Sequence, residues 1–183
     1  LHRGVLPLDR FHVPRSLRKT IRRGRFELTV DRDFPAVIAA CAEATADRPR
    51  TWLNDDIIAL YVDLHRRGHA HSIETWEHGR LVRGLYGLAL GGAFCGESMF
   101  SRATDASEVA LVELVARLRI GGYVLLDTQF VNDHLTQFGI EEITRSAYKA
   151  RLKKALTIDA SLPVGPGCFA AVLVGRAAAG EAR

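Results

Sequence analysis

Apolar residues recur at helical spacing in the first part of the chain. Leu17 and Ile21 stand four residues apart within a basic stretch, which predicts a short helix over residues 14–22. Asp33 can cap a second helix that carries Pro35 in its first turn. The apolar face of this second helix would consist of Phe34, Val37, Ile38 and Cys41. Two helices are therefore expected before residue 45.

A third helix is marked more strongly. Asn54 can cap its first turn, and Gly68 is expected to end it. Its buried stripe is predicted to be Ile57, Leu60, Tyr61 and Leu64. Further along, Ser107 opens a helix that Gly121 and Gly122 close. The residues expected to point inward from that helix are Val109, Leu111, Val112, Leu114, Val115 and Leu118. Two shorter helices are predicted over residues 133–138 and 145–156.

The stretches of sequence between these predicted helices have patterns typical of strands. Alternation over residues 71–76, then 81–90, then 93–100, with turn residues between them, predicts a meander of three strands. The apolar run 123–127 is typical of a strand buried on both faces. Residues 168–174 could form an edge strand, and 177–183 resemble a frayed tail. This order of helices and strands predicts an α+β or mixed α/β fold, with a mixed sheet flanked by helices.

Composition limits the class of protein. With 183 residues, of which 48% are apolar, the chain fits one domain with one substantial core. No apolar stretch approaches the length needed to cross a bilayer, so no membrane partner is expected. The cysteines Cys41, Cys95 and Cys168 are widely spaced and odd in number, which favours a reducing, cytoplasmic compartment.

Charge is concentrated at the start of the chain. Residues 1–25 hold eight basic side chains against Asp9 alone, a net charge of +7, whereas the whole chain carries +4. Such a block is typical of a protein that binds a polyanion, because each neutralised phosphate releases counterions. A basic face that is simply solvated would give the same pattern.

Missing motifs narrow the chemistry. The sequence has no GxxxxGK[ST] loop, no GxGxxG after a strand and no GxSxG elbow, so nucleotide hydrolysis, dinucleotide chemistry and an acyl-enzyme serine have no support. His65, His69 and His71 lie close together, but Gly68 interrupts the first two and no further ligand follows at zinc spacing. We therefore interpret them as capping and strand-face histidines and expect no metal.

Polar side chains interrupt two of the predicted strands. Glu97 lies inside an apolar strand, and Asp127 and Gln129 end another. Buried carboxylates need partners or a chemical role. Alternation places Asp127 and Gln129 on one face, so the carboxylate could orient the amide. A strand end that is polar by chance, or a helix cap at Asp127, would explain the pattern equally well.

Several strings are similar, in order and spacing, to those of the leucyl/phenylalanyl-tRNA–protein transferase family. They are HAHSIETW at 69–76, LYG at 85–87, FCGESMFSR at 94–102, AS at 106–107, LDTQ at 126–129 and NDH at 132–134. TWL at 51–53 and the segment 11–19 match as well, so the resemblance covers residues 3–156. GESMFS is the most specific of these strings.

The resemblance implies a fold and a set of sites. Residues 1–163 would form a catalytic domain similar to GCN5-related N-acetyltransferases, with a basic helix at 14–23, followed by a partly disordered segment 164–183. Asp127, Gln129 and Glu97 would be catalytic, and Trp52 would lie near the terminal adenosine of tRNA. The pocket for the transferred side chain would be formed by Leu85, Phe94, Leu111, Leu114 and Leu126. The contacts to tRNA would come from Arg18, Lys19, Arg22 and Arg23.

The implied activity is transfer of leucine, and also phenylalanine or methionine, from aminoacyl-tRNA to proteins that begin with Arg or Lys, marking them for N-degron proteolysis. The family needs no cofactor, and a monomer is expected. Two other functions share parts of the pattern. A CoA-dependent N-acyltransferase of small molecules would share the fold, although no CoA pyrophosphate loop is found. A non-catalytic tRNA-binding module would keep the basic helix but would not need Asp127 and Gln129.

Overall fold

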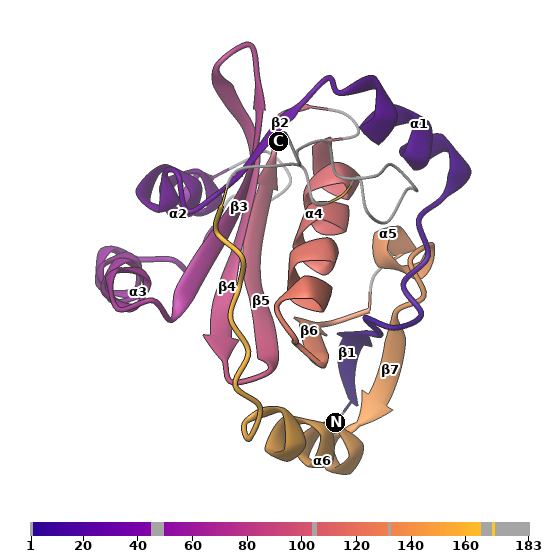
Figure 1. Cartoon of the computed structure of the whole chain (residues 1–183). Helices are drawn as coiled ribbons and strands as arrows, with labels where there is room; N and C mark the ends of the chain where they lie inside the picture. Colours follow the sequence, from indigo (N-terminus) through magenta and orange to yellow (C-terminus); the bar gives the residue numbers. More distant parts are fainter. Residues whose placement is uncertain (1, 45–49, 104–105, 132, 166–169, 171–183) are drawn as a thin grey trace, which may run out of the picture.

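The chain folds as a mixed sheet with helices on both of its faces, here described from a computed structural model (Figure 1). The structure describes residues 2–44, 50–103, 106–131, 133–165 and 170. The helices in this part of the chain are α1 (Arg15–Arg23), α2 (Phe34–Ala42), α3 (Asp55–Arg66), α4 (Ala106–Ile120), α5 (Asp133–Thr136) and α6 (Arg145–Ala155). The strands are β1 (His2–Leu6), β2 (Glu27–Val30), β3 (Ala70–Glu77), β4 (Arg80–Leu90), β5 (Ala93–Ser101), β6 (Leu125–Gln129) and β7 (Glu141–Thr144).

The strands form one sheet in the order β2-β3-β4-β5-β6-β1-β7. The pair β5 and β6 is parallel, and the other neighbours are antiparallel. The parallel pairing is short, because it joins only residues 93–95 of β5 to residues 125–127 of β6. Both strands continue beyond this pairing, β5 to Ser101 and β6 to Gln129. The sheet therefore opens between β5 and β6 just past Asp127.

Two apolar cores lie on opposite faces of the sheet. Alternation along β4 sends Leu85 to the core shared with α1 and α4, and Tyr86 to the core shared with α2 and α3. The helix α4 is buried nearly all around, which is typical of a helix packed between two layers. Its charged pair Glu113 and Arg117 is fully buried, at 2.8 Å from Oε1 to Nε. Arg117 also donates to the carbonyl of Gly165, so segment 163–165 lies against α4.

The meander and the capped helices were predicted correctly. Asp33 accepts from the backbone N–H of Ala36, and Asn54 accepts from that of Ile57. The order of elements was incomplete, because the short strands β1, β2 and β7 were not predicted. The predicted strand 168–174 and tail 177–183 lie outside the described residues, apart from Ala170.

Two predictions about burial were wrong. Leu60 of the predicted α3 stripe is 56% exposed, whereas Ile57, Tyr61 and Leu64 do pack on the sheet core, together with Ile58 and Val62. The strand expected at 123–127 begins at Leu125, and Val124 is half exposed before it. An apolar run does not by itself fix where backbone pairing starts, which explains the second error.

Among the described residues, no helix combines the length and the apolar character needed to cross a membrane.

Candidate active site

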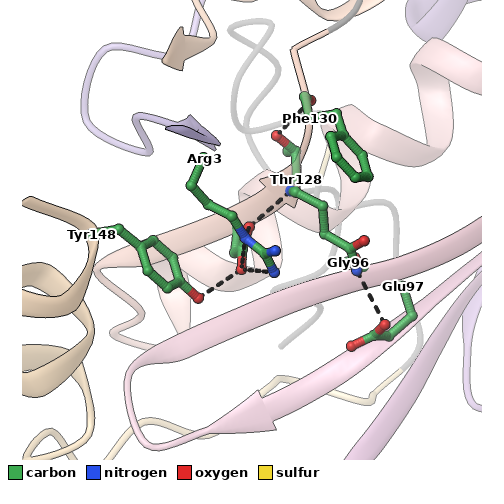
Figure 2. A network of polar contacts seen from close by, with 8 residues as sticks. Arg3, Gly96, Glu97, Thr128, Phe130 and Tyr148 are labelled. Atoms are coloured by element: carbon green, nitrogen blue, oxygen red, sulfur yellow. Dashed lines mark hydrogen bonds and ion pairs between the residues drawn. The ribbon is translucent and has the colours of Figure 1, made fainter. Parts of the chain in front are cut away.

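The carboxylate of Asp127 is fully buried at the point where β5 and β6 separate, and donors surround it (Figure 2). Arg3 donates to it through Nε and Nη2, at 2.9 Å to Oδ1 and 2.8 Å to Oδ2 respectively. The hydroxyl of Tyr148 donates to Oδ2 at 2.7 Å. The backbone N–H of Gln129 donates to Oδ1 at 2.8 Å. These bonds compensate the loss of water around a buried charge.

Gln129 ends β6 in a left-handed backbone conformation, with φ of 66°. Few residues other than glycine adopt this region, so the turn needs support from its surroundings. Its side-chain Nε2 donates to the carbonyl of Gly96 at 3.0 Å and to Glu97 Oε2 at 3.1 Å. The next backbone N–H, of Phe130, donates to the carbonyl of Thr128 at 2.7 Å. This turn therefore places the side-chain amide of Gln129 across the opening, against β5.

The relation between Asp127 and Gln129 differs from the one that strand alternation predicted. Asp127 was expected to orient the side-chain amide of Gln129, but it bonds the backbone N–H of that residue. The side-chain amide bonds Glu97 instead. The positive φ at Gln129 is the reason, because it breaks the alternation of side-chain directions at the strand end.

Glu97 lies on β5 between Gln129 and the helix α3. Burial raises the pKa of its carboxyl above the usual value, and hydrogen bonds from Tyr61 and Gln129 oppose that shift. Burial also raises the pKa of the Tyr61 hydroxyl, and the neighbouring Glu97 adds to this shift. The Tyr61 ring meets the ring of Trp52 edge-on, with centroids 6.3 Å apart. Trp52 is half exposed, so an exposed aromatic surface adjoins the polar site.

The five apolar residues expected to form a side-chain pocket are all buried in the core that α4 shares with the sheet. Leu111 and Leu114 come from α4, and Leu85, Phe94 and Leu126 come from β4, β5 and β6. Phe94 pairs with Leu126 across the parallel strands, one residue before Asp127. Two members of the cluster, Phe94 and Leu126, therefore lie next to the opening in the sheet.

The basic helix is α1, and its apolar side packs on the same core. Leu17 and Ile21 are its buried residues, as the spacing predicted, and Gly24 caps it in the left-handed conformation that glycine favours. Lys19, Arg22 and Arg23 are exposed. Arg18 is partly buried and its Nε donates to the carbonyl of Val13 at 2.9 Å. Its side chain therefore helps to hold the start of α1, in addition to any contact with a partner.

The histidines occupy the kinds of position that were predicted. His65 lies in the last turn of α3, where it stacks on Phe34 with centroids 4.3 Å apart. His71 lies on β3, and its Nδ1 is 2.7 Å from Asp31 Oδ2. In the described part of the chain, no group of three or more His, Cys, Asp or Glu side chains could hold a metal ion.

Three residues of the site were not predicted from the sequence. Arg3 was counted only as part of the basic block, and Tyr61 only as a core residue. Tyr148 was not singled out, although it stands among basic residues on a short helix. A tyrosine or arginine that bonds a buried carboxylate more than 20 residues away leaves no local pattern, so sequence periodicity gives no signal for it.

Comparison with known proteins identifies the family. The family profile described as leucyl/phenylalanyl-tRNA protein transferase matches residues 5–153. Proteins named leucyl/phenylalanyl-tRNA--protein transferase are similar to this chain. The protein from Paramagnetospirillum magneticum is 64% identical over 154 residues, which are 84% of this chain and 74% of the relative. The protein from Maricaulis maris is 54% identical over 164 residues, which are 90% of this chain and 76% of the relative.

Another relative, from Rhizorhabdus wittichii, bears the same name and is 59% identical over 165 residues, 90% of this chain and 66% of its own length. Among solved structures, L-PGS from Bacillus licheniformis matches with a TM-score of 0.49 and 12% identity over 82% of this chain and 57% of that one. The match of the family profile and the identities to the curated relatives agree with each other. The chain belongs to the leucyl/phenylalanyl-tRNA protein transferase family.

Proposed function

We propose that this chain catalyses the transfer of leucine, and less readily phenylalanine or methionine, from aminoacyl-tRNA to the N-terminal amine of proteins that begin with Arg or Lys. Membership of the family supports the reaction class. The observation that carries the proposal is the amide of Gln129, which is held at the opening between β5 and β6 by Gly96 and Glu97.

The reaction is an aminolysis of the ester on the terminal ribose. The α-amino group of the acceptor attacks the ester carbonyl, a tetrahedral intermediate forms, and the ribose oxygen leaves with a proton as the new peptide bond is made. Because an α-amino group has a pKa of about 7.7–8.0, an appreciable neutral fraction exists near neutral pH. Positioning of the two substrates therefore matters more than a strong base.

Gln129 is suited to position the attacking amine. Its Nε2 is occupied by Gly96 and Glu97, so the orientation of the amide group is set. Among the described residues none donates to its Oε1, and this oxygen is therefore available to accept a hydrogen bond from the amine. Asp127 supports the turn rather than taking the proton, because its oxygens already accept from Arg3, Tyr148 and the Gln129 backbone.

The other parts of the aminoacyl-tRNA would bind around the opening between β5 and β6. The terminal adenosine would stack near Trp52 and Tyr61, and the side chain of the donor would enter the apolar cluster next to the opening. The acceptor stem would meet the exposed cations of α1, Lys19, Arg22 and Arg23. A sheet that opens between two parallel strands is also the arrangement expected of a GCN5-related N-acetyltransferase-like domain over residues 1–163.

The experiment that tests this function uses leucyl-tRNA labelled on leucine and a peptide that begins with Arg. Label should move to the peptide, and a peptide with an acetylated N-terminus should receive none, since the amine is the nucleophile. Peptides that begin with Lys or Ala define the acceptor range. A chain that moves no label, and whose melting temperature rises with CoA but not with tRNA, would instead act on an acyl-CoA.

A further inference from the structure

We propose that Arg3 and Tyr148 are positioning residues for the transfer reaction. They fix the carboxylate of Asp127, and Asp127 in turn holds the backbone of Gln129 in the conformation that aims its amide at Glu97. This inference rests on the proposed function and extends it to two residues on other elements, Arg3 on β1 and Tyr148 on α6. Figure 2 shows both side chains converging on the same group.

The carboxylate of Asp127 is held from three directions. Arg3 approaches from β1, Tyr148 from α6, and the backbone of Gln129 from the turn that follows β6. The guanidinium also lies over the Tyr148 ring, 5.4 Å from its centroid. A buried carboxylate with donors on three sides cannot rotate, and charge-assisted hydrogen bonds of this kind are short and strong. The position of Asp127 therefore depends on both residues.

The backbone conformation of Gln129 also depends on Asp127. Its φ of 66° is unfavourable for a residue with a side chain, and such a conformation persists only where contacts determine it. The hydrogen bond from its N–H to Asp127 is such a contact. Gly4 provides another, because a Cβ at this position would come within 2.6 Å of the Phe130 backbone. The strand β1 thus lies directly against the turn that carries Gln129.

The charge of Arg3 separates two neighbouring carboxylates. Asp127 and Glu97 are close enough for the negative charge of Asp127 to raise the pKa of Glu97, and Arg3 opposes that effect. The hydrogen bond to Asp127 raises the pKa of Arg3 itself, so its cation is secured at this place. Without the guanidinium, the negative charges of Asp127 and Glu97 would repel each other with no cation beside them. This repulsion would displace the side-chain amide of Gln129, which bonds Glu97.

Single-turnover transfer with Tyr148→Phe and Arg3→Gln tests the proposal. Phenylalanine keeps the ring beneath Arg3 and removes only the hydroxyl. Each variant should lower the rate at saturating leucyl-tRNA by about tenfold or more, the size expected when a hydrogen bond to a charged group is lost, with unchanged affinity for leucyl-tRNA. Matched controls are Tyr123→Phe, whose hydroxyl bonds the Leu162 backbone, and Arg32→Gln, whose ion pair with Glu27 is exposed. Both controls should keep the wild-type rate.

Amide hydrogen exchange provides a readout that needs no substrate. In the wild-type chain the N–H of Gln129 should exchange slowly, because it donates to Asp127. Tyr148→Phe and Arg3→Gln should speed exchange at Gln129 while leaving the β3 and β4 amides unchanged. A general loss of stability would instead speed exchange across the whole sheet and would overturn a positioning role.

A double-mutant cycle shows whether the two residues act through Asp127. In an Asp127→Ala background, Arg3→Gln and Tyr148→Phe should have little further effect on the transfer rate. Rates that fall by the same factor in both backgrounds would overturn the proposal, as would a loss of tRNA affinity at unchanged rate, since that would make Arg3 a binding residue. An inactive wild-type chain would refute the proposed function, whereas exchange at Gln129 would still report on the positioning.

Discussion

The carboxylate of Asp127 holds the main chain of Gln129 at 2.8 Å, and the side chain of Gln129 reaches Glu97 on the neighbouring strand. The two residues therefore have different structural roles. Asp127 shapes the turn, and Gln129 presents an amide to the open side of the sheet. A proton relay between their side chains would need a contact that is absent from the described part of the chain.

The first prediction separates these two tasks. Gln129→Ala should lower the transfer rate by about a hundredfold, because removing one group aimed at a reacting centre has an effect of this order. Asp127→Asn should also lower the rate, since it removes the charge that Arg3 and Tyr148 hold. Both variants should bind tRNA with the wild-type affinity. The check is the single-turnover rate measured beside a tRNA binding curve, and an equal loss of both would indicate a docking role for these residues.

The second prediction concerns the raised pKa of Glu97. A carboxyl group whose pKa is raised by folding stabilises the fold below its usual value of 4.5, and this contribution is lost as the pH rises through the raised value. Glu97→Gln should therefore gain stability relative to the wild type as the pH rises from about 4 to 8. Urea midpoints at several pH values measure the difference.

A matched variant should behave in the opposite way. Glu77 is partly buried, and its hydrogen bond with Arg25 lowers the pKa of its carboxyl. A lowered pKa stabilises the fold above the usual value and is lost in acid, so Glu77→Gln should become relatively less stable as the pH rises. The same slope in both variants would contradict the assignment of burial as the cause of the shift at Glu97.

The parts of the fold that follow local patterns could be predicted from the sequence. Caps at Asp33 and Asn54 mark helix starts, and Gly91 with Gly92 marks the turn between β4 and β5, because each depends on a few adjacent residues. The strands β1, β2 and β7 could not be predicted. They have four or five residues, carry charged side chains, and exist through pairing with distant strands.

Some residues of the candidate site could likewise be predicted from the sequence, and others could not. Glu97, Asp127 and Gln129 stood out as polar residues in apolar strands, and the structure brings all three to one opening. Arg3 and Tyr148 could not be found, since neither interrupts a pattern. The direction of the Gln129 side chain was predicted wrongly because alternation assumes a regular backbone, and the turn at this residue has a positive φ.

The third prediction tests the basic face of α1. Lys19→Ala combined with Arg23→Ala should weaken tRNA binding and flatten its salt dependence by about 0.9 in the log-log slope for each phosphate contact that is lost. These two side chains are exposed, so the fold should be unaffected. The matched control is Lys149→Ala with Lys153→Ala, which removes the same charge from exposed positions on α6. Equal slopes for wild type and the α1 variant would exclude phosphate contacts at these cations.

The fourth prediction concerns which amino acid is moved. A cluster formed by Leu85, Phe94, Leu111, Leu114 and Leu126 offers no hydrogen bond, so it can select a side chain only by shape. Shape distinguishes one methylene weakly, by about 1–3 kcal/mol, but it rejects branching at Cβ if the entrance is narrow. Leucine should therefore be transferred best, phenylalanine and methionine less well, and isoleucine and valine poorly.

A variant sharpens this test. Leu126→Phe should disfavour phenylalanine more than leucine, because the larger ring meets the added bulk first. Leu126 is fully buried, and overpacking a core costs about 1–3 kcal/mol, so the melting temperature must be measured beside the rates. Transfer from leucyl-, phenylalanyl- and isoleucyl-tRNA is compared in one assay. Isoleucine moving as fast as leucine would place the donor pocket elsewhere.

The position of β1 in the sheet also sets the order in which the site can form. β1 pairs with β6 and β7, and Arg3 and Asp127 are 124 residues apart in the chain. The ribosome releases β1 long before either partner, whereas the β3–β4–β5 meander needs only adjacent segments and can form early. Arg3 therefore reaches Asp127 only when the central sheet and the segment up to β7 are in place. A nascent chain would therefore hold the basic helix α1 before Gln129 is held in its turn, so transfer activity would appear last during synthesis.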